Sequence, residues 1–376
     1  MKENLRDDHC LIYGVEFTGQ NGRRIYDADG LIAEVGVDDQ TARNDFDEIY
    51  PWRNMHRCNT ALIEGERYPS AFEGESHFSN TKADVFVYVP LFYYARLPGE
   101  FGGDEMILIS DRKILKEMQP PKKFKRADGT FRDFVFLPAY TAGLLNGKPV
   151  SRSGFQPFIT SLDGWMALTA RMDEDMCIQG TDDDEIINVL LEVEFATRDP
   201  KSVMAGAIFA DDVFPAGACD GVKASSGSPV SNADGKHPCK YRGIENPWGN
   251  QFHWRWDVIV SNRNIFVLDN PKNYACGEIT DHYTKLCYQI SARDGWLDKV
   301  GHDDRFPGVQ LCTETAGTKE ESNFGQYFWQ WSDEGPYALL VGGDVAYGRN
   351  AGPRFCYVSD GPGISGWTIG AALSPA

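Results

Sequence analysis

Short alternating or β-branched stretches dominate the hydrophobic pattern of this chain, and they predict many strands. Val15 and Phe17 alternate with polar residues, residues 19–22 form a glycine-rich turn, and Ile25 begins a second run, which is the pattern of a hairpin. The aromatic run 85–94 is interrupted by a proline, which places it at the edge or start of a sheet. Further strands are predicted at residues 106–109, 134–137, 252–260, 265–268, 283–290, 328–331, 338–341, 355–358 and 367–373.

Two segments have the three-to-four spacing of amphipathic helices. Ser161 can cap the first, whose apolar residues recur over 165–172. In the second, Asp182 and Glu185 have the spacing of a capping box, and a broad apolar face follows until Pro200 closes the helix. The acidic run at the start of this helix suits the helix dipole, which explains it better than a metal site does.

Composition limits the classes of partner. The 376 residues include 38 glycines and 20 prolines, which indicates many turns, and residues 215–240 carry no periodic apolar signal and are expected to form a long loop. A net charge of −18 repels a phosphate backbone, so nucleic acid is not an expected partner. No apolar run reaches about eighteen residues and the N-terminus is polar, which predicts a soluble protein without a signal peptide or membrane insertion.

Nine cysteines are scattered along the chain without a CxxC pair. An odd number leaves at least one free thiol, and the pattern fits synthesis in a reducing cytoplasm. Spacing allows a disulfide between Cys219 and Cys239 or between Cys276 and Cys287, but we expect all nine to be buried or incidental.

The last fifty residues divide into a frame of Trp, Gly, Leu and Ala and into short clusters of small polar residues and tyrosine. The frame comprises Trp329 and Trp331, then ALLVGG (338–343), NAGPR (350–354) and WxIGAxLS (367–374). Between these blocks lie SDEGPY (332–337), DVAYGR (344–349), YVSDG (357–361) and GISG (363–366). Tyr, Ser, Gly and Asp in loops are the residue types that build adaptable binding surfaces.

This frame resembles that of the variable proteins of diversity-generating retroelements, which include phage tropism determinants. Four frame blocks occur in the same order and with suitable spacing. Segments 46–59, 87–94, 108–111 and 241–250 resemble parts of phage structural proteins and of the formylglycine-generating-enzyme-like version of the C-type lectin fold. The resemblance covers the chain from about residue 40 and implies an α+β, C-type-lectin-like fold.

The resemblance also implies a mechanism of variation, in which a reverse transcriptase errs at adenines and rewrites AAC or AAT codons. Such codons cannot become Trp or Gln, so Trp329, Gln330, Trp331 and Trp367 are expected to be constant. The positions expected to vary and to bind ligand are Tyr327, Ser332, Asp333, Gly335, Tyr337, Asp344, Ala346, Tyr347, Arg349, Tyr357, Ser359, Asp360, Ile364, Ser365, Gly366 and Thr368.

Aromatic and arginine anchors contribute most of the energy of an interface, so we expect four of these residues to make the main contacts: Tyr337, Tyr347, Arg349 and Tyr357. Glu334 lies in the same clusters, but its residue type departs from the codon chemistry.

No catalytic pattern stands out. HExxH, GxSxG and P-loop motifs are absent from the sequence. The formylglycine-generating enzymes use a pair of nearby cysteines to bind copper, whereas Cys312 and Cys356 are far apart in sequence. A turn explains the acidic residues around His302 better than a metal or acid-base site. We expect no enzyme activity, cofactor or metal, although a glycosidase carboxylate pair stays open in so acidic a chain.

The tryptophans of segment 248–256 suit a buried strand face better than a sugar-stacking platform.

These observations predict two regions. Residues 1–80 form a β-rich region that attaches the protein to a virion tail or to partners in a trimer. Residues 81–376 form the lectin-like domain, with its variable region at 325–374. The expected partners are a host cell-surface receptor, which is a protein or a glycan, and phage tail components. By analogy with the tropism determinants, the protein could form a homotrimer. The protein would be assembled in the bacterial cytoplasm and located at the tail tip. The alternatives are a formylglycine-generating-enzyme-like or polysaccharide-modifying enzyme, and a structural tail component.

Overall fold

The computed structural model describes residues 11–375, apart from 174 and 332–333, and it is mainly β. Within this part of the chain there are two α-helices, so the expected α+β class is corrected to mainly β. The largest sheet has the order β18 (Tyr283–Gln289), β17 (Asn264–Leu268), β16 (Phe252–Ser261), β22 (Tyr337–Gly342), β23 (Gly352–Tyr357), β21 (Tyr327–Trp329), β19 (Gly295–Val300) and β20 (Cys312–Ala316), with β24 (Ile369–Gly370) beside β16.

Two four-stranded sheets are built mainly from the first third of the chain. The first has the order β2 (Asn21–Tyr26), β1 (Tyr13–Thr18), β8 (Glu105–Ser110) and β7 (Tyr93–Pro98), and contains the predicted hairpin. The second has the order β5 (Glu66–Phe72), β4 (His56–Ile63), β6 (Val85–Pro90) and β9 (Phe134–Pro138). A division of the chain at residue 80 would cut both sheets, because β1 pairs with β8 and β4 pairs with β6.

Smaller sheets complete the fold. One has the order β15 (Ile244–Glu245), β14 (Lys240–Tyr241), β13 (Ser226–Ser228) and β3 (Gly36–Val37), and the pairs are β10 (Gly143–Leu145) with β11 (Lys148–Val150) and β12 (Met176–Ile178) with β25 (Leu373–Pro375). The expected loop 215–240 therefore contains a strand, and Cys219 and Val222 of this loop are buried. Short 3-10 helices lie at η1 (Asp45–Glu48), η2 (Trp52–Asn54), η3 (Lys122–Phe124), η4 (Pro200–Ser202), η5 (Pro271–Asn273) and η6 (Gly348–Asn350).

The predicted strand 85–94 is wrong as a single element. The chain turns at Leu91 and Phe92, so that β6 and β7 belong to different sheets. The side chain of Phe92 is fully buried in the core between them. The hydrophobic pattern could not show the break, because both strands are equally rich in aromatic residues.

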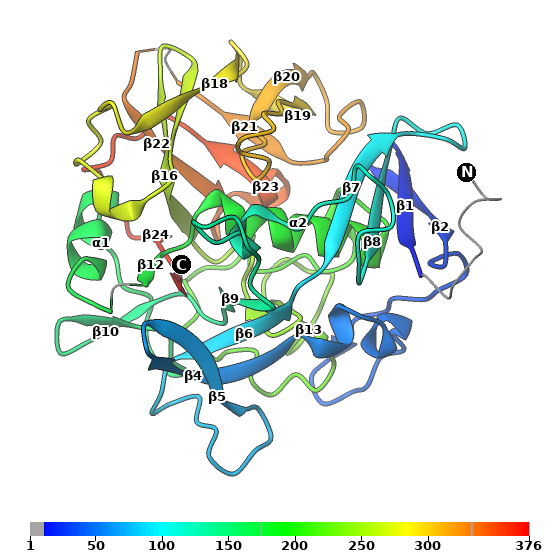
Figure 1. Cartoon of the computed structure of the whole chain (residues 1–376), viewed down its shortest axis with the longest axis horizontal. Coiled ribbons are helices and arrows are strands. Elements are labelled where there is room, and N and C mark those ends of the chain that lie inside the picture. The colour runs from blue at the N-terminus through cyan, green and yellow to red at the C-terminus, as the bar shows by residue number, and fades with distance from the viewer. Residues whose placement is uncertain (1–10, 174, 332–333, 376) are drawn as a thin grey trace.

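Helix α1 (Leu162–Thr169) begins as predicted, since the Ser161 side chain accepts a hydrogen bond from the Gly164 N–H. Helix α2 (Thr181–Phe195) begins slightly earlier than predicted, with Gly180 as its N-cap. The Asp183 carboxylate accepts the Gly180 N–H at 3.0 Å, which is one half of a capping box, since glycine has no side chain to accept a hydrogen bond in return. Figure 1 shows α2 crossing the middle of the molecule, between the N-terminal sheets and the large sheet. Neither helix is long and apolar enough to cross a membrane.

Helix α2 is buried on almost every side, although its sequence is strongly acidic. The Glu192 carboxylate pairs with Arg354 of β23 at 2.6 Å and with Arg96 of β7 at 3.1 Å. The Glu194 carboxylate pairs with Arg242 at 2.6 Å. Nearby Arg354 and Arg96 outweigh burial and lower the pKa of Glu192 from 4.5 to about 2. The pairs of Glu192 join the helix to strands of two separate sheets, and the pair of Glu194 joins it to the turn between β14 and β15.

Replacing Glu192 by Gln is expected to lower the free energy of unfolding by about 3–5 kcal/mol at pH 7, because two arginines lose a buried partner. The pKa of Glu192 is lower in the folded than in the unfolded chain. Its stabilisation is therefore present above pH 4.5 and is lost as the pH falls towards 2, and the variant should lack this part of the acid dependence. Urea unfolding at several pH values measures both effects.

The matched control is Glu314→Gln, because the Glu314 carboxylate pairs with Lys299 at 2.7 Å on the exposed surface. This change should lower the free energy of unfolding much less, because an exposed ion pair contributes little to stability. Equal losses in the two variants would show that the buried pairs do not hold α2 in place.

Candidate functional site

One face of the large sheet carries a row of aromatic side chains near the predicted variable region. Trp296 of β19 lies opposite Tyr327 of β21, and Trp329 of β21 lies beside Tyr357 of β23. Ring centroids are 5.5 Å apart between Trp296 and Tyr327 and 5.9 Å apart between Tyr327 and Trp329. Together with Tyr347, these half-buried residues form what we call the aromatic row.

Tyr347 joins the row from a loop rather than from a strand. Its loop follows β22 and folds back, so that its ring lies 4.7 Å from Phe252 and 5.3 Å from Phe355. The Tyr357 ring also contacts Phe252, at 5.8 Å between centroids. Phe252 and Phe355 are 5% and 0% exposed, so they form a fixed floor beneath two partly exposed tyrosines.

The hydroxyl groups of the row stay protonated in the neutral range. Burial, followed by the nearness of Tyr357, Asp344 and Asp360, raises the pKa of Tyr347 to about 12. Burial and Asp360 also raise the pKa of Tyr357, and burial raises that of the Asp360 carboxyl. The Tyr327 hydroxyl donates to Asp294 at 3.1 Å. The row therefore offers a ligand aromatic area, tyrosine hydroxyl groups and the carboxyl group of Asp360.

The backbone beneath the row is held by Gln326 and by residues of the NAGPR block. The Gln326 side chain accepts the Arg354 N–H at 2.6 Å and donates to the Arg198 carbonyl at 2.8 Å. Arg354 also pairs with Glu192 of α2. Gly352 has a φ of +149°, and a Cβ there would lie 2.4 Å from the Gln326 side chain, so the NAGPR block requires glycine at this position.

The structure separates the predicted variable residues by exposure. Asp344 and Thr368, at 5% and 8% exposed, correct the expectation that all sixteen face outwards. The Asp344 carboxylate accepts the Ala346 N–H at 2.9 Å and so shapes the loop. Ser332 and Asp333 lie outside the described residues. The exposed positions are Ala346, Arg349, Ile364 and Ser365, and the half-buried ones are Tyr327, Gly335, Tyr337, Tyr347, Tyr357, Ser359, Asp360 and Gly366.

Of the four expected contact residues, the structure brings two together. Tyr347 and Tyr357 share the floor formed by Phe252. Tyr337 packs against the core on the opposite face of the sheet, because side chains alternate along β22. Arg349 lines a separate cavity of about 230 Å³.

Sequence reasoning missed the tryptophans as surface residues. Trp331 and Trp367, which belong to the frame, are 80% and 59% exposed. Trp296 was not singled out at all. The spacing of two from Tyr327 through Trp329 to Trp331 was the available signal, because it places alternate residues of a strand on one face.

The cysteines and the segment 248–256 offer little chemistry. The eight cysteines within the described part of the chain are free thiols, and all of them are buried except Cys276 and Cys287, which are exposed. Cys312 and Cys356, which are distant in sequence, lie in one core cluster, and burial followed by the nearness of Cys356 raises the pKa of Cys312. Trp248 and Trp254 are buried as predicted, whereas Trp256 is half-buried. Among the described residues, no three His, Cys, Asp or Glu side chains converge as metal ligands.

Comparisons with known proteins find distant likenesses of structure. No family model matches the chain, and no curated protein matches it at a significant level. The Major Tropism Determinant U1 Variant is similar over 98% of this chain and 82% of its own, at 12% identity and a TM-score of 0.33. The Major Tropism Determinant M1 Variant is similar over 85% and 72%, at 13% identity and a TM-score of 0.34.

The arrangement predicts that Tyr347 can be replaced and that Phe252 cannot. Phe252→Ala removes a buried ring and should lower the free energy of unfolding by about 3–5 kcal/mol. Tyr347→Ser removes a partly exposed ring from the top of the floor and should cost about 1 kcal/mol. Urea unfolding of the two variants compares these costs, and equal losses would mean that Tyr347 belongs to the core.

Proposed function

We propose that the protein is a receptor-binding protein of a phage tail, with a C-terminal surface that a retroelement diversifies. The observation that carries this proposal is the pair Tyr347 and Tyr357, partly exposed above a floor of buried phenylalanines. Both lie at positions expected to vary, and the floor beneath them belongs to strands. Side chains on such a surface can be exchanged while the backbone stays in place.

Binding in this proposal depends on a few anchors. Tyrosine supplies a large contact area and loses little conformational entropy, because its side chain has two rotatable angles. Trp296 and Trp329 extend the surface with residues that adenine-directed mutation of AAC or AAT codons does not create. The aromatic row thus combines constant and exchangeable contacts, which suits a protein that must change its receptor without losing its fold.

The partners follow from the same proposal. The receptor is a protein or glycan of the host cell surface, and tail components bind elsewhere on the molecule. Residues 1–80 are proposed to contribute to this attachment as part of the common fold. Several copies at a tail tip, as in a homotrimer, would make a weak single contact effective through multivalency. The role is binding, and we propose no catalysed reaction, metal or cofactor.

The binding surface can be tested by replacing Tyr347 and Tyr357 with serine in the full chain. Each loss of an aromatic anchor is expected to weaken adhesion to receptor-bearing cells about thirtyfold, because anchors at the centre of an interface contribute about 2 kcal/mol or more. Purified protein is titrated onto cells of a strain that the wild type binds. The control is Tyr68→Ser, which changes a tyrosine of β5 that is 38% exposed. Unchanged adhesion in the double variant would contradict the proposal.

The diversification is tested separately, in the DNA. We expect a reverse-transcriptase gene near this gene, together with a near-copy of codons 325–374 that differs mainly where the template has adenines. Sequencing of the locus and of several isolates should show substitutions at Tyr347 and Tyr357 and none at Trp329. A locus without the reverse transcriptase and the near-copy would contradict the diversification part of the proposal. The receptor-binding part would then depend on the adhesion measurement alone.

A further inference from the structure

A second candidate binding site lies at the cavity that Arg349 lines, apart from the aromatic row. This cavity has a volume of about 230 Å³ and is formed by η4, the segments around Phe209 and Asp234, and Lys319. We call it the lysine pocket. It is smaller than the roughly 300–1,000 Å³ of pockets that hold drug-sized ligands, so it suits one small chemical group.

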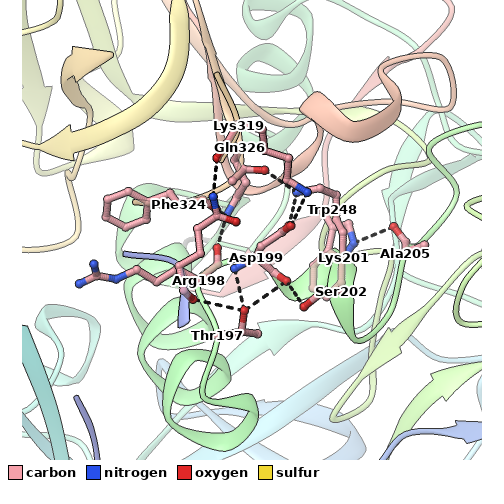
Figure 2. A network of polar contacts seen from close by, with 12 residues as sticks. Thr197, Arg198, Asp199, Lys201, Ser202, Ala205, Trp248, Lys319, Phe324 and Gln326 are labelled. Carbon is pink, nitrogen blue, oxygen red and sulfur yellow. Dashed lines mark hydrogen bonds and ion pairs between the residues drawn. The ribbon is translucent and has the colours of Figure 1, made fainter. Parts of the chain in front are cut away.

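The pocket is built around a carboxylate that two lysines share. The Asp199 Oδ1 atom pairs with the Lys201 ammonium and its Oδ2 atom with the Lys319 ammonium, both at 2.6 Å (Figure 2). Lys201 also donates to the Gly325 carbonyl at 3.1 Å. Two ammonium groups therefore face one carboxylate, which leaves one positive charge without a counter-charge.

Arg349 adds a further cation at the surface. Its side chain is exposed, and among the described residues no hydrogen bond or ion pair holds its guanidinium. Asp234, the other acidic residue that lines the pocket, contacts His237 at 3.0 Å and accepts the Lys236 N–H at 2.9 Å. In a protein of net charge −18, a pocket with an excess of positive charge is an exception to the overall field.

The burial of Lys201 shows that the excess positive charge of the pocket is energetically unfavourable. Its side chain is 5% exposed, and desolvation followed by the effect of Lys319 lowers its pKa to about 8 although Asp199 opposes the shift. An anion placed beside the two lysines would favour the charged form of Lys201. The site is thus arranged so that a negatively charged ligand relieves an electrostatic cost already present.

The pocket also has an apolar side. Phe209 is 51% exposed, and Ala205, Ile208 and Ala233 line the wall beside it. A half-exposed aromatic ring next to cations is suited to a ligand with an apolar face and an anionic group, which is the chemistry of an acidic sugar. A free inorganic anion would use the cations but not the ring.

We propose that the lysine pocket binds the carboxylate-bearing sugar of an acidic glycan. The carboxylate lies between Lys319 and Arg349, and the apolar face of the sugar packs on Phe209. This inference deepens the proposed receptor-binding function, because it names an acidic glycan as a ligand. It uses Arg349, a position expected to vary, together with lysines that belong to the constant part of the chain.

The test uses the purified full chain and soluble probes, without host cells. Isothermal titration with glucuronate, glucose and inorganic sulfate distinguishes the contributions of sugar and charge. We expect glucuronate to bind, and glucose and sulfate to bind at least about tenfold more weakly. Equal binding of glucuronate and glucose would overturn the proposal, as would sulfate binding as tightly as glucuronate, which would indicate an inorganic-anion site.

Variants of the pocket residues test which side chains contact the ligand. Arg349→Gln and Lys319→Gln should each weaken glucuronate binding about tenfold, and Phe209→Ala should weaken glucuronate but not sulfate. Lys148→Gln, which removes an exposed charge elsewhere, is the matched control and should change nothing. If the Arg349 and Lys319 variants unfold at the wild-type temperature and bind glucuronate with unchanged affinity, the proposed site is wrong. Since Tyr347 and Tyr357 lie outside the pocket, their serine variant should still bind glucuronate, so failure of the aromatic row and failure of the pocket are distinguishable.

Discussion

The burial of an acidic helix in the middle of the fold is the constraint on which the rest of the structure depends. A carboxylate that leaves water without a partner is very costly, so the buried acids of α2 are met by cations or hydrogen-bond donors from neighbouring elements. Glu192 is met by arginines of β7 and β23, Glu194 by Arg242, and Asp184 by Arg255 of β16. The helix thereby sets how the sheets lie around it.

The same pairs position the candidate site. Arg354 belongs to the strand that carries Tyr357, and its guanidinium reaches α2 through Glu192. Arg255 on β16 ties the strand of Phe252 to the same helix through Asp184 at 2.7 Å. The floor of the aromatic row is therefore attached to the centre of the molecule from two strands. A surface supported in this way can carry exchangeable side chains, because their contacts are not needed to hold the strands.

Much of the fold was readable from the hydrophobic pattern. The hairpin of β1 and β2, the strands β8, β9, β16, β17 and β22, and both helices follow from alternation, helical spacing and capping residues. The strands β19 and β20 were missed, because their apolar residues are interrupted by charged ones and their sheet register contains irregularities. The single strand expected at 85–94 shows the same limit, since no local signal reports which sheet a strand joins.

The sequence by itself determined the division of the C-terminal region into blocks of Trp, Gly, Leu and Ala and clusters of Tyr, Ser, Asp and Gly, since residue type and order carry that information. Only the tertiary structure decided which cluster residues share a surface. It placed Tyr347 beside Tyr357, turned Tyr337 to the opposite face and sent Arg349 to a pocket with Lys319. The reason is that strand pairing and loop folding bring together residues far apart in the chain, and those contacts leave no periodic signal in the sequence.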